Sequence, residues 1–144
     1  PRMLRVRAMA NEASAIASLR SLITAQDAYA KTCGAGAYAV AFATLGQPPE
    51  GATSGFLGVD LTAAPFPTKA GYGFTIAPGA GAADATADCN GNPASTAYYA
   101  KAVPQTFGLS GRRSFAVSAT RAIWQTFSPT APVEPFGPPA VPID

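Results

Sequence analysis

The sequence contains no histidine, and this absence excludes much of the chemistry that a small protein could perform. Histidine is the usual general base near neutral pH and the commonest metal ligand, so no Ser-His-Asp or Cys-His catalytic arrangement can form. Ser110, in the glycine-containing stretch 108–111, therefore has no histidine to activate it as a nucleophile. We expect a protein that is not an enzyme and that binds no cofactor.

Charge is also scarce. Only 12% of the residues are Asp, Glu, Lys or Arg, which is about half the usual density for a globular protein, and the net charge is +2. Such a small excess gives no electrostatic argument for a nucleic-acid partner or an acidic partner. We expect protein partners and no nucleic acid.

Oxygen ligands and paired arginines occur in two places, and each has a plainer interpretation. Asp84, Asp88 and Asn90 could hold calcium in a loop, but they lack the spacing of an EF-hand, and Asp and Asn are common in turns. Arg112 and Arg113 could bind a phosphate, but exposed charges beside a strand are common. We expect no metal site and a solvated arginine pair.

Long hydrophobic runs are missing as well. No stretch reaches the length of about eighteen apolar residues that a membrane-spanning helix needs, and the first residues do not resemble a signal peptide. The chain starts at Pro1 rather than at Met, and we expect a segment upstream of it. The length of 144 residues suits one domain with one modest core.

Cysteine is limited to Cys33 and Cys89. An even pair in a small chain that is poor in charge is typical of an exported, oxidised protein, and we expect one disulfide. The alternative is two buried free thiols in a cytoplasmic protein, because spacing alone cannot prove pairing. A bond would stabilise the fold by roughly 4 kcal/mol in the chain-entropy treatment.

Residues 1–32 favour one long helix, because residues 2–32 contain no Gly or Pro and are rich in good helix formers. Its second half has an apolar face, which we expect to pack on a sheet: Ile16, Leu19, Leu22, Ile23 and Tyr29. Its first half mixes apolar side chains with Arg2, Arg5 and Arg7, and we expect it to project from the globular body. This half supplies the candidate interface with other subunits: Pro1, Met3, Leu4, Val6, Met9 and Ala13.

Residues 33–127 are expected to form a globular head. A long Gly- and Pro-rich loop with one short helix comes first, followed by strands near residues 71–77, 96–103, 114–118 and 121–127. This pattern predicts an α+β fold with a three- to four-stranded antiparallel sheet. Trp124 could anchor another subunit, although ordinary sheet packing is favoured. Residues 128–144 contain six prolines, which predict an extended polyproline-like tail.

Several segments occur in the order found in type IV pilin-like proteins, and together they resemble the soluble part of major type II secretion pseudopilins. The helical block at residues 11–20 is the most specific of them, with Ala25, Gln26 and Tyr29 after it. The other segments are Tyr38, Leu45-Gly46, Gly71-Tyr72-Gly73-Phe74, Ala102-Val103-Pro104 and residues 111–117. The resemblance covers residues 1 to about 124 and leaves out the Pro-rich tail.

The resemblance implies a pilin fold and a structural role. Such a chain would be the soluble domain of a pilus or secretion-pseudopilus subunit that forms a helical filament with other pilin-like subunits. An upstream hydrophobic helix would anchor it in the inner membrane before assembly, and it would then lie in the periplasm or in an extracellular filament. The 144-residue chain would be monomeric. The alternative is a minor pilin or a surface-binding and adhesion module that uses the head or the tail.

Overall fold

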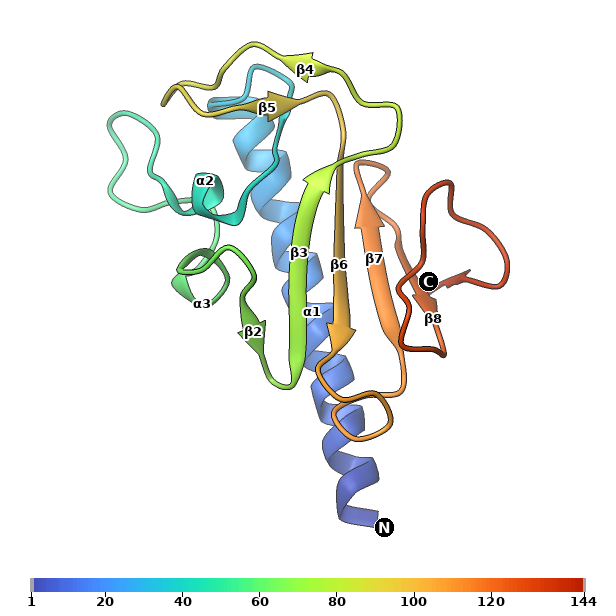
Figure 1. The fold of residues 1–144 in the computed structure, drawn as a ribbon. Helices are drawn as coiled ribbons and strands as arrows, with labels where there is room; N and C mark the ends of the chain where they lie inside the picture. The colour runs from blue at the N-terminus through green and yellow to red at the C-terminus, as the bar shows by residue number, and fades with distance from the viewer. Residues whose placement is uncertain (1, 144) are drawn as a thin grey trace.

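The computed structural model of the chain describes residues 2–143 and has an α+β architecture. One long helix, α1 (Arg2–Thr32), lies across one face of an antiparallel sheet (Figure 1). The N-terminal end of α1 extends beyond the sheet, whereas its C-terminal end lies under the loops at the opposite end of the head. At 1.5 Å per residue, the 31 residues of α1 span about 46 Å.

The large sheet has six strands in the order β2-β3-β6-β7-β8-β9, so the expectation of three to four strands was wrong. Four longer strands form its centre: β3 (Tyr72–Pro78), β6 (Tyr98–Pro104), β7 (Ser114–Ser118) and β8 (Ile123–Thr126). Two-residue strands extend it at both edges: β2 (Thr68–Lys69) and β9 (Val141–Pro142). All neighbouring strands are antiparallel.

The edge strand β2 forms because the chain makes a two-residue hairpin turn before β3. Lys69 pairs with Tyr72, and the intervening Ala70 and Gly71 both have positive φ angles, of 48° and 78°. That backbone suits a turn that matches the twist of paired strands, although it is unfavourable for an alanine. Two-residue strands have no clear hydrophobic alternation, so the sequence pattern did not reveal them.

A second, three-stranded sheet has the order β1-β5-β4 and lies at the end of the head near the C-terminus of α1 (Figure 1). Its strands are β1 (Tyr38–Ala39), β4 (Asp84–Ala85) and β5 (Ala94–Ser95). The connecting loop expected after α1 contains two short helices, α2 (Phe42–Gly46) and α3 (Val59–Thr62), as well as β1 and β2. This loop is therefore more regular than its composition predicted.

The main core lies between α1 and the large sheet. Alternate residues of the central strands turn toward the helix and are buried, such as Phe74, Phe115 and Val117. Ala100 and Ala102 occupy the corresponding positions of β6 and are fully buried, so the small side chains leave room for the helix. The helix contributes Leu19, Leu22, Ile23 and Tyr29 as buried residues, while Ile16 packs against the cluster and is half-buried.

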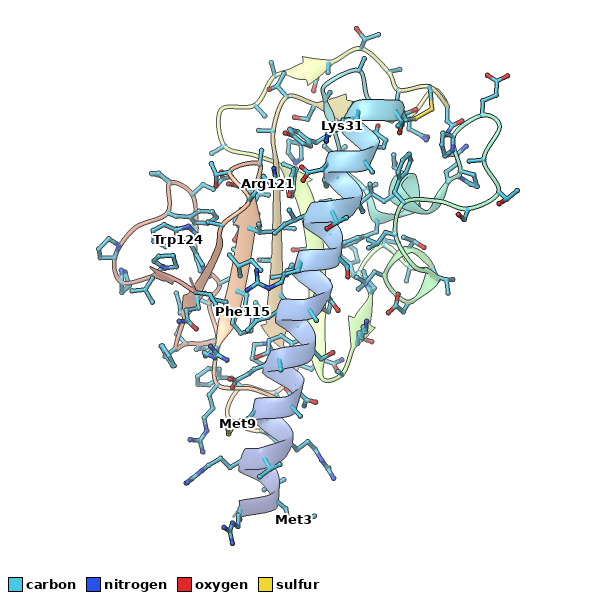
Figure 2. All side chains as sticks on the ribbon, turned by 180° about the vertical axis from the view of Figure 1, so that it is seen from behind. Met3, Met9, Lys31, Phe115, Arg121 and Trp124 are labelled. Atoms are coloured by element: carbon cyan, nitrogen blue, oxygen red, sulfur yellow. A yellow bond between two sulfur atoms is a disulfide. The ribbon has the colours of Figure 1, made fainter. Side chains whose placement is uncertain are left out.

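The Pro-rich tail packs against the head, and the composition did not predict these contacts. Phe136 stacks on Trp124 with ring centroids 5.6 Å apart, and the Tyr99 hydroxyl donates a hydrogen bond to the carbonyl oxygen of Pro132. Beyond these contacts, β9 pairs with the edge of β8. The tail therefore covers the sheet edge and the side of Trp124, which lies away from α1 (Figure 2).

Candidate functional site

The N-terminal end of α1 is the largest exposed feature that combines apolar and charged side chains. Residues 2–10, called the free end below, are all exposed except Ala8. Met3, Val6 and Met9 are 78%, 61% and 63% exposed, respectively, and Leu4 is less so. Figure 2 shows Met3 at the tip of the helix, beyond the body of the head, and Met9 nearer to the head. Ala13, farther along the helix, is also exposed, and Pro1 lies outside the described residues.

The first hydrogen bonds between α1 and the head are made by the loop between β6 and β7. The Asn11 side-chain amide donates to the carbonyl oxygen of Ser110 at 3.0 Å. The Glu12 carboxylate accepts from the Arg112 backbone N–H and from Arg113 Nε, each at 2.8 Å. Glu12 is buried and Arg113 is half-buried, so this ion pair is screened less than a surface pair.

Arg113 links this junction to the sheet. Its Nη1 donates to Gln125 Oε1 at 2.7 Å, and its backbone carbonyl accepts from the Tyr72 hydroxyl at 2.6 Å. The guanidinium also lies 5.2 Å from the Phe115 ring centroid. The expectation of a solvated pair thus fails for Arg113 and agrees only with the exposure of Arg112.

Sequence reasoning missed this junction. The available signal was Glu12, because it is the first acidic residue of the chain and lies within an otherwise uncharged stretch of the helix. A lone acid in such a position suggests a partner elsewhere, and an arginine pair precedes a predicted strand. Pairing the two required knowledge of which loop reaches the middle of α1, which only the tertiary structure provides.

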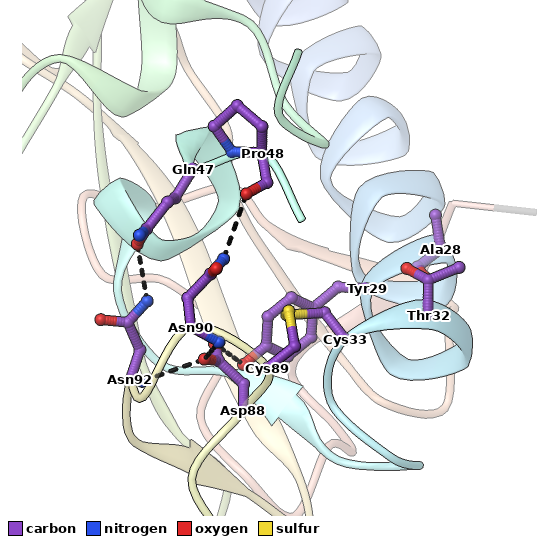
Figure 3. The surroundings of a disulfide bond; sticks show 10 residues. All are labelled: Ala28, Tyr29, Thr32, Cys33, Gln47, Pro48, Asp88, Cys89, Asn90 and Asn92. Carbon is purple, nitrogen blue, oxygen red and sulfur yellow. Dashed lines mark hydrogen bonds between the residues drawn. A yellow bond between two sulfur atoms is a disulfide. The ribbon is translucent and has the colours of Figure 1, made fainter. Parts of the chain in front are cut away.

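The opposite end of α1 is held by covalent and polar contacts. Cys33 and Cys89 form the expected disulfide, with Cα atoms 4.9 Å apart (Figure 3). The buried Gln26 side chain accepts a hydrogen bond from the Ala39 N–H and donates one to the Ala39 carbonyl, at 2.9 and 2.8 Å. These contacts fix the last turns of the helix against the second sheet.

Next to the disulfide, the Tyr29 hydroxyl donates to Asp88 Oδ2 at 2.6 Å. Burial raises the pKa of Asp88, but hydrogen bonds from Tyr29 and from the backbone N–H groups of Asn92 and Asn90 outweigh it, so the pKa is lowered. Burial, and then the bond to Asp88, raise the pKa of Tyr29. Asp88 is therefore a charged acceptor that organises its own loop and anchors the helix.

This role argues against the calcium interpretation of Asp84, Asp88 and Asn90. Both oxygens of Asp88 already accept hydrogen bonds within the protein, as Figure 3 shows. Asp84 begins the separate strand β4. Among the described residues, Asp88 does lie close to both cysteine sulfur atoms, but these sulfurs are joined in the disulfide and offer no thiolate ligand.

The remaining candidates have structural partners. The Ser110 hydroxyl accepts from the Thr106 N–H and donates to the Thr106 carbonyl, so it closes its own turn. Trp124 is half-buried under the tail and stacks on Phe136. Neither residue is placed as a nucleophile or as an open docking anchor.

None of the helices within residues 2–143 has an apolar stretch of the length that crossing a bilayer requires. Compared with protein-family models, with curated proteins and with solved structures, the chain matches none. The arguments for a function therefore come from the chain's own residues, and the free end of α1 is the feature that calls for a partner.

Proposed function

We propose that the chain is the globular domain of a type IV pilin-like subunit that assembles into a pilus or a secretion pseudopilus. The observation that carries this proposal is the free end of α1, a helical extension whose Met3, Val6 and Met9 side chains are 78%, 61% and 63% exposed. Burying one such side chain is worth about 1.5–3 kcal/mol, so the same contact repeated along a filament would stabilise it.

The asymmetry of the fold favours an open assembly over a closed dimer. The free end lies at one pole of the molecule and the second sheet at the other (Figure 1). A contact between two different surfaces repeats from subunit to subunit and generates a helical filament when the rotation does not close. The long helix packed on an antiparallel sheet also suits the pilin fold that the sequence resemblance implies.

The disulfide fits the compartment that this role requires. Disulfides are typical of proteins from oxidising compartments such as the periplasm or the extracellular space. In the proposed role, a hydrophobic segment upstream anchors the subunit in the inner membrane, and the subunit later joins a periplasmic or extracellular filament. The 144-residue chain alone should remain monomeric.

The test compares substitutions of exposed valines in two places. Val6→Asp places a charge on the free end, and Val59→Asp places the same charge on the head, where Val59 is 76% exposed. The source cells would produce each full-length variant, and electron microscopy would count surface or periplasmic filaments. We expect Val6→Asp to reduce filaments at least tenfold and Val59→Asp to leave them near the wild-type number.

Thermal unfolding of both purified variants controls for folding, and both should unfold within a few degrees of the wild type. Wild-type filament numbers in a Val6→Asp, Met9→Asp double variant would contradict the proposal. A tight closed dimer of the 144-residue chain would also contradict it, since a self-complementary interface does not propagate.

A binding or adhesion role of the head is the second candidate. A specific observation favours it, namely the exposed Phe66 ring beside an apolar recess lined by Val40, Phe42 and Ile76. The tail is a weaker candidate, because its Phe136 is already stacked on Trp124. Phe66→Ala should reduce adhesion without changing filament number if the head binds a partner. Unchanged adhesion would contradict the binding role of the head, and the structural role in a filament would then be the one candidate that remains.

A further inference from the structure

The positive charge of the chain is concentrated at the free end. Residues 2–10 contain Arg2, Arg5 and Arg7 and no acid, whereas residues 12–144 contain the other seven basic residues and all eight acidic ones. Outside the free end the formal charge is therefore about neutral, at −1. The net charge of +2 hides this uneven distribution.

The three arginines of the free end have no acidic partner in the described part of the chain. The ion pairs between residues 2 and 143 involve Lys69, Arg113 and Arg121, all in the head. The nearest acid along the helix is Glu12, and its carboxylate binds Arg112 and Arg113. The charges of the free end are consequently available to an external anion.

These arginines surround the helix and do not line one face. Successive residues of an α-helix are rotated by about 100°, so Arg5 and Arg7 lie roughly 300° and 140° around the axis from Arg2. The exposed Met3, Leu4, Val6 and Met9 fill the directions between them. We call this set of seven side chains the mixed ring.

From the mixed ring we infer that the free end binds the surface of a bilayer containing anionic phospholipids, with the helix standing across the headgroup layer. A flat protein surface would contact only one side of a helix, whereas a headgroup layer surrounds it. From Arg2 to Arg7 the helix rises about 7.5 Å, close to the roughly 5–7.5 Å thickness of one headgroup layer. The arginines would reach phosphates while the apolar side chains nearest the tip of the helix, Met3, Leu4 and Val6, contact the acyl boundary.

This inference does not rest on the filament role, because vesicle binding and filament assembly are measured separately. The two roles are compatible only if they occur one after the other. Side chains in contact with lipid headgroups cannot also contact a neighbouring subunit, so membrane contact would precede assembly.

The test uses the purified 144-residue chain and sedimentation with vesicles of phosphatidylcholine, with and without phosphatidylglycerol. We expect binding only to the vesicles with phosphatidylglycerol, and a steep loss of binding as salt rises from about 20 mM to about 500 mM. The variant R2Q/R5Q/R7Q should lose roughly 100-fold in partitioning, because each arginine near an anionic surface contributes about tenfold or somewhat less.

A matched control removes three positive charges that lie outside the free end. The variant K31Q/K69Q/K101Q has the same net charge as R2Q/R5Q/R7Q, and we expect its partitioning to stay within about threefold of the wild type. Met3→Glu should also weaken binding, which would separate insertion of the mixed ring from simple charge attraction.

Several outcomes would overturn the inference. These are no binding of the wild type to anionic vesicles at low salt, equal losses in the two triple variants, or unchanged binding of R2Q/R5Q/R7Q. Salt-sensitive self-association without lipid that R2Q/R5Q/R7Q abolishes would also overturn it, since the arginines would then recognise a second copy of the chain. All variants are at exposed or half-exposed side chains, and circular dichroism would verify their folding.

Discussion

The two ends of α1 differ in what holds them in a helical conformation. Residues 22–32, the anchored end, are held against the head by the Gln26 bonds to Ala39, by the Tyr29 bond to Asp88 and by the disulfide of Cys33, the residue that directly follows the helix. In the free end, Ala8 is the one buried residue among the described positions 2–10. The same helix is thus fixed by tertiary contacts at one end and depends on local preference at the other.

This difference shows where the sequence serves stability and where it is available for partners. The anchored end carries polar groups that are satisfied inside the protein. The free end carries apolar and cationic groups that the head leaves largely exposed, and exposed apolar side chains are unfavourable in water unless something else covers them. Perturbing each end in turn should therefore have effects of very different size on unfolding.

The largest effect is expected from the disulfide of the anchored end. The double variant C33S/C89S should lose roughly 4 kcal/mol of unfolding free energy, because the bond spans 56 residues and restricts the unfolded chain. That is a large part of the stability of a small domain. Thermal and denaturant unfolding of oxidised wild type, reduced wild type and the variant would measure it. A loss below about 1 kcal/mol would mean that polar contacts alone hold this end.

The boundary between the two ends should show the next largest effect. Glu12→Gln leaves Arg113 without its charged partner in a half-buried site, and we expect a loss of about 2 kcal/mol, between the values for surface and buried pairs. Asp27→Asn is the matched control, because Asp27 pairs with the exposed Arg121 at 3.0 Å. The control should lose less than about 0.5 kcal/mol in urea unfolding. Equal losses would show that burial of Glu12 adds nothing.

A smaller effect is expected from Tyr29→Phe, which removes one hydrogen bond to Asp88. The loss at neutral pH should be about 1–1.5 kcal/mol, since the carboxylate keeps its two backbone donors. The core around the ring is unchanged by this substitution. Denaturant unfolding at pH 7 is the measurement, and a stability equal to that of the wild type would argue against this bond.

The pH dependence of the same variant has a defined sign. The folded-state pKa of Asp88 is lowered, because hydrogen bonds outweigh the opposing effect of burial. Asp88 therefore contributes stability above its unfolded pKa of about 3.9, and this contribution is lost as the pH falls through the lower folded value. Tyr29→Phe should reduce this acid sensitivity below about pH 4. A steeper acid loss in the variant than in the wild type would contradict the assignment.

The sequence predicted the features that depend on composition and periodicity. Residues 2–32 lack helix breakers over a long stretch, and the four central strands of the sheet lie close to the four predicted segments. The pairing of Cys33 with Cys89 was also expected, since the chain contains no other cysteine. The signals for the helix and the strands are local in the sequence, and each cysteine has only one other cysteine with which it can pair.

The features that the sequence did not reveal depend on contacts between distant residues. The tail composition predicted extended backbone. It gave no sign that Phe136 stacks on Trp124 or that β9 pairs with the edge of the large sheet. Glu12 and Arg113 are 101 residues apart, and no periodicity connects them. Exposure of the free end was predictable from its mixed pattern, whereas the hydrogen bond that ties Asn11 to the head was not.

The smallest effect on global unfolding is expected from a glycine in the free end. Ala10 and Ala28 are both exposed alanines of α1, and replacing either by glycine lowers intrinsic helix stability by about 1 kcal/mol. Ala28→Gly should lower the global unfolding free energy by that amount, because the anchored end cannot fray without breaking tertiary contacts. Ala10→Gly should lower it by less than about 0.5 kcal/mol and instead speed amide exchange in residues 2–9. Equal losses would mean that the free end unfolds only with the head, and that the helix is stabilised to its tip by the head itself.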